Sequence, residues 1–203
     1  MAFESNVFIN CPFDDDYKPM LKSIIFTVIC CGYQPQLSEN KDSSENRLGN
    51  IQDLIEKSKY SIHDLSRMEA AKKGQLARFN MPFELGMDFG CKRYKGGEHT
   101  NKKCLILDKD RYRYQKALSD ISGSDISGHN NSPETATRHV RNWLQRQQKE
   151  EVSSLQTASD IWNWYNEFEG NFETNTNKSD RDQMPWNEYF NFIKAFLTGK
   201  RML

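Results

Sequence analysis

The sequence predicts an α/β protein, with a doubly wound parallel sheet of four to five strands and a C-terminal helical appendage. Short apolar runs alternate with helical patterns over the first 108 residues. That alternation is typical of a parallel sheet with helices on both faces. Beyond about residue 148 the strand patterns stop, and two aromatic-rich helical segments follow. We therefore divide the chain into an α/β domain, residues 1–148, and a helical extension, residues 149–203.

Apolar runs predict four strands and the start of a fifth, in a flavodoxin-like sheet. The predicted strands are Val7–Asn10, Gly32–Leu37, Tyr60–Leu65, Lys103–Leu107 and a short one from Asp125–Ile126. Pro35 cannot donate to a ladder, so the second strand is expected near an edge. The nearly continuous apolar character of the fourth strand indicates a central position.

Helical spacing of apolar residues predicts the connecting segments. These helices are Tyr17–Cys31, Arg47–Ser58, Pro82–Tyr94, Tyr112–Ile121 and Pro133–Gln148, with Ile161–Phe168 and Trp186–Leu197 in the extension. Pro19 falls in the first turn of the first helix, and Gly32 ends it. Gly86 and Gly90, four residues apart, are expected to let their helix approach the sheet closely. The segment Gln147–Ser154 is the predicted linker.

The charge composition excludes a global electrostatic role. The 203 residues include 28 basic and 28 acidic side chains, so the formal net charge is zero. No overall field steers the protein to nucleic acid or to an anionic membrane, and we expect neither as a partner. Residues 92–116 nevertheless carry nine Lys/Arg against three Asp/Glu, and residues 149–190 carry three against nine. We expect the acidic segment to fold back on the basic one.

The cysteines and the hydropathy pattern indicate a reduced, cytoplasmic protein. No apolar run approaches the roughly 20 residues that span a bilayer, and no basic-then-apolar signal pattern opens the chain. The five cysteines form no CxxC pair and no Cys/His ladder. The sequence therefore indicates neither a disulfide framework nor a metal site, and we expect no cofactor.

Glu84 is the residue most suited to chemistry. It lies in Asn80–Gly86, Asn-Met-Pro-Phe-Glu-Leu-Gly, in the predicted first turn of a helix. The helix dipole stabilises a carboxylate there, and this structural role alone explains many such glutamates. The carboxyl edge of a parallel sheet, however, is where ligands bind. Asp88 follows one turn later, and two nearby carboxylates can raise the pKa of one of them.

Polar residues also end two strands at that edge. Asp64, Ser66 and Arg67 follow the third strand. One interpretation is a turn, in which Asp and Ser cap backbone amides. The other is a set of donors and acceptors for a ribose or phosphate, with Arg67 supplying a guanidinium fork. The residues alone leave both interpretations open.

The first strand ends in Asn10-Cys-Pro-Phe13. Asn10 and Phe13 are candidates to grip a ring or a sugar, and Asn80 is a further substrate-binding candidate. We interpret the acidic run Asp14–Asp16 as a helix N-cap, because it lacks the glycine-bearing loop of an EF-hand.

Other polar and aromatic residues have ordinary structural interpretations. We expect His63, inside a strand, to be a satisfied core residue, and His129, in a loop, to be solvated. Basic and aromatic residues interleave at 110–116; they can stack bases, but more often cover a helix surface. The C-terminal aromatic side chains recur near helical spacing, which indicates core or a subunit interface. They are Trp162, Trp164, Tyr165, Phe168, Trp186, Tyr189, Phe190, Phe192 and Phe196.

Taken in order, these motifs resemble a known superfamily. The order of motifs is similar to that of the nucleoside 2-deoxyribosyltransferase-like fold and its relatives, the TIR-type NADase domains. It consists of a strand followed by Asn-Cys-Pro-Phe, a strand followed by Asp-Leu-Ser, Phe-Glu-Leu-Gly on a helix, and then an apolar strand. A bacterial family of uncharacterised proteins has similar Asn-Cys-Pro-Phe and Asn-Met-Pro-Phe-Glu-Leu-Gly segments. The resemblance covers about residues 7–108.

The resemblance implies roles for two residues. In the transferases, the glutamate of the matching helix attacks the anomeric carbon of the sugar. In TIR-type NADases, a glutamate on the equivalent helix supports cleavage of the nicotinamide–ribose bond. Both roles carry over to Glu84, and the transferase aspartate after the third strand carries over to Asp64. The chain departs from both patterns: Asn80–Pro82 replaces the common Gly-Thr pair, and the Ser-x-x-Trp pattern of many TIR domains is missing.

Three functions follow as expectations. The first is an NAD-cleaving glycosidase or ADP-ribosyl-transferring enzyme, of the kind that TIR-like domains supply in bacterial antiphage defence. Such an enzyme is expected to assemble as a homo-oligomer through the aromatic C-terminal helices. The second is a deoxyribosyltransferase-like enzyme acting on nucleosides or nucleotides. The third is a non-catalytic nucleotide sensor or adaptor. Nicotinamide leaves as a neutral ring without a general acid, and no acid is evident beside Glu84, so the sequence favours NAD.

Overall fold

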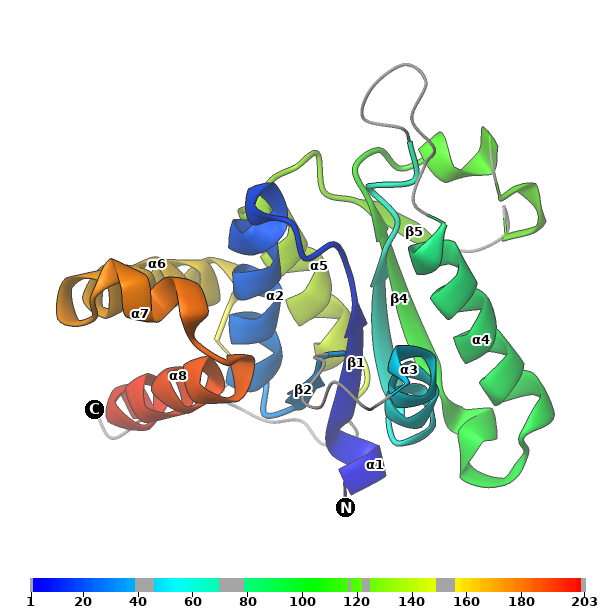
Figure 1. Ribbon diagram of the computed structural model, residues 1–203, viewed down its shortest axis with the longest axis horizontal. Coiled ribbons are helices and arrows are strands. Elements are labelled where there is room, and N and C mark those ends of the chain that lie inside the picture. The colour runs from blue at the N-terminus through cyan, green and yellow to red at the C-terminus, as the bar shows by residue number, and fades with distance from the viewer. Residues whose placement is uncertain are drawn as a thin grey trace.

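A computed structural model describes residues 2–38, 46–69, 79–116, 118–121, 125–148 and 156–201 of the chain. It contains a five-stranded, all-parallel sheet in the order β2-β1-β3-β4-β5 (Figure 1). The strands are β1 Asn6–Asn10, β2 Gln34–Gln36, β3 Tyr60–Asp64, β4 Lys103–Asp108 and β5 Ile126–Gly128. This is the flavodoxin-like strand order, so the predicted fold class is confirmed, with β2 at an edge as its proline indicated.

Helices cover both faces of the sheet. They are α1 Ala2–Ser5, α2 Lys18–Cys30, α3 Arg47–Glu56, α4 Asn80–Tyr94, α5 Pro133–Gln145, α6 Ala158–Asn175, α7 Lys178–Gln183 and α8 Trp186–Arg201, with 3₁₀ turns at Asp15–Tyr17, Gly97–Asn101, Arg113–Lys116 and Ser119–Ile121. Helices α3 and α4 lie on one face, and α2 and α5 on the other (Figure 1). Helices α6 and α8 pack against the outer side of α2.

Helix α2 is buried nearly all round because of its sequence. Asp14 caps the preceding 3₁₀ turn, accepting a hydrogen bond from Tyr17 N at 3.1 Å. Pro19 lies in the first turn of α2, and Gly32, at φ 85°, follows its end. The run between them is apolar except for Lys22, Ser23 and Thr27, and a helix that is apolar nearly all round is stable only when it is covered on most sides. The sheet covers one side of α2, and the C-terminal helices cover the other.

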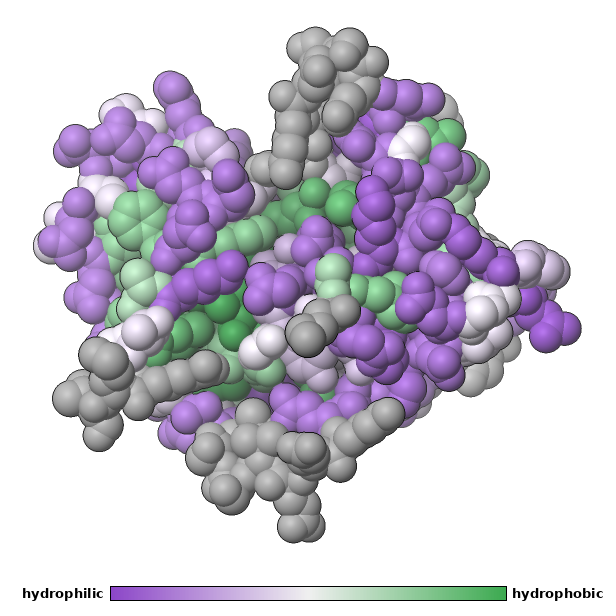
Figure 2. Space-filling view, turned by 90° about the horizontal axis from the view of Figure 1, so that it is seen from below, coloured by the Kyte–Doolittle hydropathy of each residue, from purple (hydrophilic) through white to green (hydrophobic). Residues whose placement is uncertain are grey.

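The C-terminal helices share the core of α2. Phe26 is fully buried, and its ring centroid lies 5.7 Å from that of Tyr165, 5.6 Å from that of Phe168 and 6.2 Å from that of Phe196. Figure 2 shows the face of the molecule at the amino ends of the strands. On this face hydrophobic residues gather near the C-terminal helices, whereas the part formed by α3 and α4 is mostly hydrophilic. Of the two predicted alternatives, core or subunit interface, core is confirmed for Tyr165, Phe168 and Tyr189, which are buried, whereas Phe192 is 39 % exposed.

Three expectations differ from the structure. The predicted helix Tyr112–Ile121 consists of two 3₁₀ turns where it is described. The acidic C-terminal segment does not fold back on the basic residues 92–116: its described part lies against α2, whereas the basic residues belong to α4, β4 and the turns around them (Figure 1). Burial of the aromatic faces against α2 outweighs the attraction between exposed charges. The predicted linker falls largely on residues 149–155, outside the described residues.

Candidate functional site

The carboxyl edge of the sheet is lined by buried polar residues. Asn10 ends β1, Asp64 ends β3 and Asp108 ends β4; their exposed fractions are 2 %, 0 % and 0 %. In this strand order the connections from β1 and β3 leave on opposite faces, so the crevice for a ligand opens between these two strands. The residues singled out in the sequence therefore come from the expected edge of the sheet.

Glu84 lies in the second turn of α4, not the first. The helix begins at Asn80. Pro82 is tolerated in its first turn because the N–H groups of that turn have no partner within the helix. The Glu84 side chain is only 6 % exposed, and it makes no hydrogen bond to any residue that the structure describes. Burial raises the pKa of Glu84 to about 7, although the positive charge of Arg47 acts to lower it. Glu84 is thus a carboxyl group that is half protonated near neutral pH.

The end of β1 lies beside this carboxyl group. Asn10 Nδ2 donates to the carbonyl oxygen of Met81, one turn before Glu84, at 3.1 Å. The pKa of the Cys11 thiol is raised by burial and further by the charges of Asp64 and Glu84. Glu84 therefore lies on the α4 side of the crevice between β1 and β3.

A chain of buried hydrogen bonds fixes the Asn10 amide. Asn10 Nδ2 lies 2.9 Å from His63 Nδ1, and His63 Nε2 lies 3.1 Å from Asp88 Oδ2. The same Asn10 nitrogen contacts the Met81 carbonyl oxygen, so it is the amide donor, and His63 Nδ1 is an acceptor. His63 is then a neutral imidazole that donates through Nε2 to Asp88. Both amide protons of Asn10 are engaged, so its Oδ1 is the atom left to accept from a ligand. The prediction that His63 is a satisfied core residue is confirmed.

Asp88 belongs to this network rather than to a carboxylate pair. Burial acts to raise its pKa, but hydrogen bonds from His63 and Ser61 and the charge of Lys102, whose ammonium lies 3.0 Å from Asp88 Oδ1, lower it to about 2. The expected coupling with Glu84 is wrong, since burial and not Asp88 raises the pKa of Glu84.

Three possible metal-binding atoms lie close together at the same place. Potential ligand atoms of His63, Asp88 and Cys104 lie within 4.8 Å of one another. The chemistry of this set does not fit a metal ion. Lys102 places an ammonium against the same carboxylate, and burial raises the pKa of Cys104, which keeps its thiol protonated.

A second buried cluster holds Asp64. Tyr17 Oη donates to Asp64 Oδ2 at 2.5 Å, His129 Nε2 lies 3.0 Å from the same oxygen, and Ser66 N donates to Oδ1 at 2.8 Å. Asn131 N donates to His129 Nδ1 at 3.0 Å, which makes Nε2 the protonated nitrogen. Burial acts to raise the pKa of Asp64, but these bonds hold it below its ordinary value.

His129 corrects one expectation. Its side chain is fully buried, whereas the sequence predicted a solvated loop histidine. The partner carboxylate of Asp64 is distant in the sequence and is brought next to His129 by the pairing of β3, β4 and β5. Because Asp64 is fully buried among Tyr17, Ser66 and His129, it presents no exposed oxygen to a ribose, and its hydrogen bond from Tyr17 makes it a positioning group for that residue.

A cavity of about 560 Å³ opens on the α2 side of the edge. Ser66 and Arg67 line it, together with Lys109, Arg113 and Tyr17. Arg67 forms an ion pair with Asp14 at 3.1 Å. Arg113 is held by Asp108 at 2.5 Å, which leaves Lys109 as the lining cation whose side chain has no ion pair among the described residues. Sequence patterns did not identify Lys109, whose only signal was its place directly after β4.

The structure separates the predicted residues into two groups. Asn10 and Glu84 lie on the α4 side of β1 and β3, whereas Ser66 and Arg67 line the cavity on the α2 side. Phe13 is 36 % exposed, and Asn80 is exposed at the start of α4. Glu84 lines none of the five main cavities found among the described residues.

Gly86 and Gly90 are not needed for close packing of α4 against the sheet. A Cβ atom added at Gly86 or Gly90 would meet nothing within 4 Å. The expectation that these glycines let α4 approach the sheet is therefore wrong, since alanine fits at both positions.

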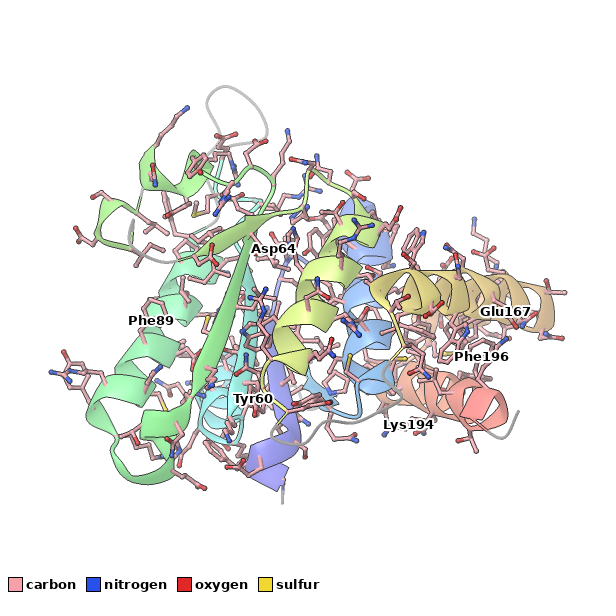
Figure 3. The ribbon with its side chains drawn as sticks, turned by 180° about the vertical axis from the view of Figure 1, so that it is seen from behind. Tyr60, Asp64, Phe89, Glu167, Lys194 and Phe196 are labelled. Carbon is pink, nitrogen blue, oxygen red and sulfur yellow. The ribbon has the colours of Figure 1, made fainter. Side chains whose placement is uncertain are left out.

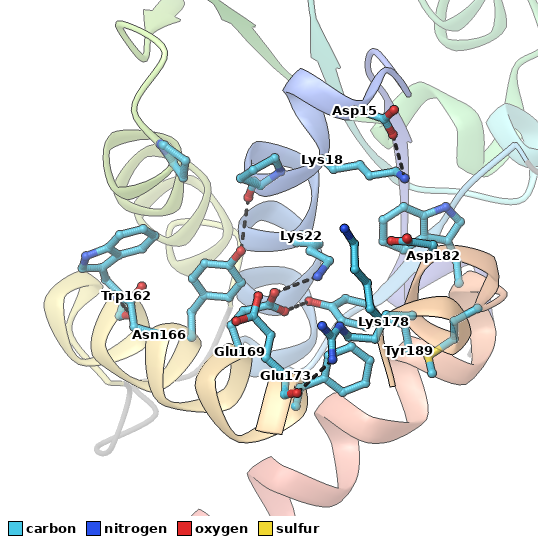
Figure 4. Close-up of a pocket in the computed structure, with 17 residues that line it drawn as sticks. Asp15, Lys18, Lys22, Trp162, Asn166, Glu169, Glu173, Lys178, Asp182 and Tyr189 are labelled. Carbon is cyan, nitrogen blue, oxygen red and sulfur yellow. Dashed lines mark hydrogen bonds and ion pairs between the residues drawn. The ribbon is translucent and has the colours of Figure 1, made fainter. Parts of the chain in front are cut away.

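Another cavity, of about 620 Å³, lies between α2 and the C-terminal helices (Figure 4). Its central groups satisfy one another: Lys22 Nζ lies 2.7 Å from Glu169 Oε2, Tyr189 Oη donates to Glu169 Oε1 at 2.5 Å, and the Lys22 ammonium lies 5.1 Å from the Tyr189 ring centroid. These contacts bind the extension to α2 and pair the central charged groups of the cavity with one another.

No protein-family model, no curated protein and no solved structure matches the chain. Within the described residues, none of the helices has the length and apolar character needed to cross a membrane.

Proposed function

We propose that the protein cleaves an N-glycosidic bond of NAD, with Glu84 as the catalytic carboxylate. The observation that carries the proposal is the state of Glu84: a buried carboxyl group, without a hydrogen bond among the described residues and with a pKa of about 7, beside the crevice at the end of β1. A carboxylate so placed can stabilise an oxocarbenium-like transition state or trap it as an ester.

The surrounding acids favour a leaving group that needs no proton. Asp64 and Asp88 are both held ionised by their hydrogen bonds, so neither can protonate a departing base. When the bond between the ribose carbon and the nicotinamide nitrogen breaks, its electron pair neutralises the pyridinium ring. Nicotinamide therefore departs without general acid catalysis, unlike a purine or pyrimidine.

The remaining residues have supporting roles in this proposal. Asn10 Oδ1, oriented by His63 and Asp88, accepts a hydrogen bond from a ribose hydroxyl. Arg67 is assigned to the phosphates, and Phe13 and Asn80 to the rim of the crevice. NAD is a substrate here, and the proposal includes no cofactor. Whether the chain hydrolyses NAD or transfers the ADP-ribosyl group, as in antiphage TIR-like domains, follows from product analysis.

A second candidate is a nucleotide-binding module without turnover. The observation in its favour is that Glu84 lines none of the five main cavities. Incubation with NAD, and in parallel with a deoxynucleoside plus a free base, separates the alternatives. Nicotinamide release supports the glycosidase, base exchange supports a deoxyribosyltransferase, and calorimetric binding of NAD without either product supports the module. The glycosidase is overturned if NAD binds and stays intact at high protein concentration, which favours assembly.

A further inference from the structure

The sheet has an open edge beside β5. Strand β5 pairs only with Ile106–Asp108, the second half of β4. The first half, Lys103–Leu105, has β3 on one side and, within the described residues, no strand on the other. Seen from behind, this edge lies between α4, which carries Phe89, and α5, and neither helix crosses it (Figure 3).

The backbone of Cys104 faces the open side. Lys103 N donates to Lys59 O and Leu107 O accepts from Leu65 N, so these odd-numbered residues of β4 face β3. Asp108 O accepts from His129 N, beyond β5. Residues of a parallel strand alternate between its two neighbours, and Cys104 therefore directs its N–H and C=O away from β3, toward the side without a strand.

A groove of about 760 Å³ runs along this edge and is larger than the cavities described above. Its apolar walls come from Phe89 of α4, Ile126 of β5 and Trp143 of α5. Trp143 is held in place by the Tyr60 ring, whose centroid is 5.9 Å away at 90°. An aromatic ring beside free strand groups is the arrangement that receives an extended peptide.

The charge around the groove is positive. Lys92, Arg111 and Arg146 line it, and Asp125 is the one carboxylate among its described lining residues. Asp125 lies 3.6 Å from Arg111. No ion pair or hydrogen bond of the Lys92 or Arg146 side chain is found within the described residues. Two cations on opposite walls, Lys92 of α4 and Arg146 directly after α5, are therefore available to a negatively charged partner.

We propose that this groove docks an acidic, extended peptide segment of another protein, which adds a strand beside the first half of β4. The main-chain groups of Cys104 supply strand pairing, Phe89 and Trp143 contact the apolar side chains of the peptide, and Lys92 and Arg146 pair with its carboxylates. The groove does not include Glu84, so the test of peptide docking is independent of the proposed glycosidase activity.

The probe is a fluorescein-labelled heptapeptide of alternating glutamate and valine, compared with its lysine–valine counterpart by fluorescence anisotropy. The acidic peptide is expected to bind and the basic one not to. Charge reversal by Lys92→Glu plus Arg146→Glu should weaken binding by roughly tenfold or more. Lys194→Glu, on the exposed surface of α8, is the control and should leave binding unchanged. Circular dichroism verifies that each variant is folded.

Hydrogen exchange locates the peptide. Strand addition predicts that the Cys104 amide becomes protected when the acidic peptide binds, and that proline at the central peptide position reduces this protection. Binding that leaves Cys104 unprotected, or that survives the charge reversals, overturns the proposal. A wild-type dimer in solution that the charge reversals convert to monomer also overturns it, because the groove is then an interface between two copies of the chain.

Discussion

Asn10 Nδ2 lies 2.9 Å from His63 Nδ1, which joins the ends of β1 and β3 through their side chains where the crevice opens. A third residue, Asp88 of α4, completes the chain at 3.1 Å from His63. The helix that carries Glu84 is thereby bonded to both strands. The position of the catalytic candidate thus depends on buried polar bonds as well as on apolar packing.

Replacement of the Asn10 amide by the isosteric carboxyl group of aspartate is expected to destabilise the fold. Asn10→Asp places a carboxylate against the Met81 carbonyl oxygen and removes the donor to His63, so it should lower the free energy of unfolding by about 2–3 kcal/mol at neutral pH. Urea denaturation measures the loss. Asn80→Asp, an exposed change in the first turn of α4, is the matched control and should be neutral or slightly stabilising. Equal effects of the two variants contradict the assigned network.

The raised pKa of Glu84 predicts a pH-dependent cost to stability. The folded-state pKa of about 7 exceeds the ordinary glutamate value of 4.5, so between these two pH values the folded protein keeps a proton that the unfolded chain loses. The stabilising contribution is complete below about pH 4.5, declines as the pH rises, and is lost above about pH 7. Glu84→Gln removes this dependence. The free energy of unfolding of the variant minus that of the wild type should therefore be larger at pH 8 than at pH 4, by up to about 3 kcal/mol. Identical pH profiles of the two proteins rule out the raised pKa.

Phe26 is expected to carry much of the attachment of the C-terminal helices. Its ring is fully buried and contacts rings of α6 and α8. Phe26→Ala should therefore destabilise the protein by about 3–5 kcal/mol. Phe192→Ala, at a position that is 39 % exposed, should cost clearly less. Thermal or urea unfolding compares them, and a similar loss at both positions is inconsistent with the shared core.

Gly86 offers a stabilising change. A Cβ atom there meets no neighbour within 4 Å, and the residue lies inside α4. Gly86→Ala should raise stability by about 0.5–1 kcal/mol through helix propensity. Gly96, at φ 76°, is the contrasting position, where alanine should destabilise by about 1 kcal/mol or more. A loss of stability at Gly86 restores the idea that this helix needs glycine.

The sequence predicted the sheet from the apolar runs Val7–Ile9 in β1 and Leu105–Leu107 in β4, which are typical of strands covered on both faces. In β3 the apolar Tyr60 and Ile62 alternate with buried polar residues. The sequence also located Asn10, Asp64 and Glu84 near the correct edge. It could not predict that Asp64 is enclosed by Tyr17 and His129, because those contacts join segments far apart in the chain.

Helix boundaries were a further source of error. Proline commonly opens a helix, so the start of α4 was predicted at Pro82 and Glu84 in its first turn. The actual start at Asn80 moves Glu84 one turn into the helix, where burial instead of the free N–H groups determines its pKa. The strength of that burial depends on α3 and the end of β1, which no local pattern reports.

The proposed catalytic role of Glu84 is tested most directly by the rate of nicotinamide release from NAD at pH 8, measured with the wild-type protein and with Glu84→Gln. Glu98→Gln, in an exposed turn beyond α4, serves as the control. We expect release by the wild type and by the control, and a loss of at least about a hundredfold in Glu84→Gln. Release at an undiminished rate by a folded Glu84→Gln variant would contradict the assignment of Glu84 as the catalytic carboxylate.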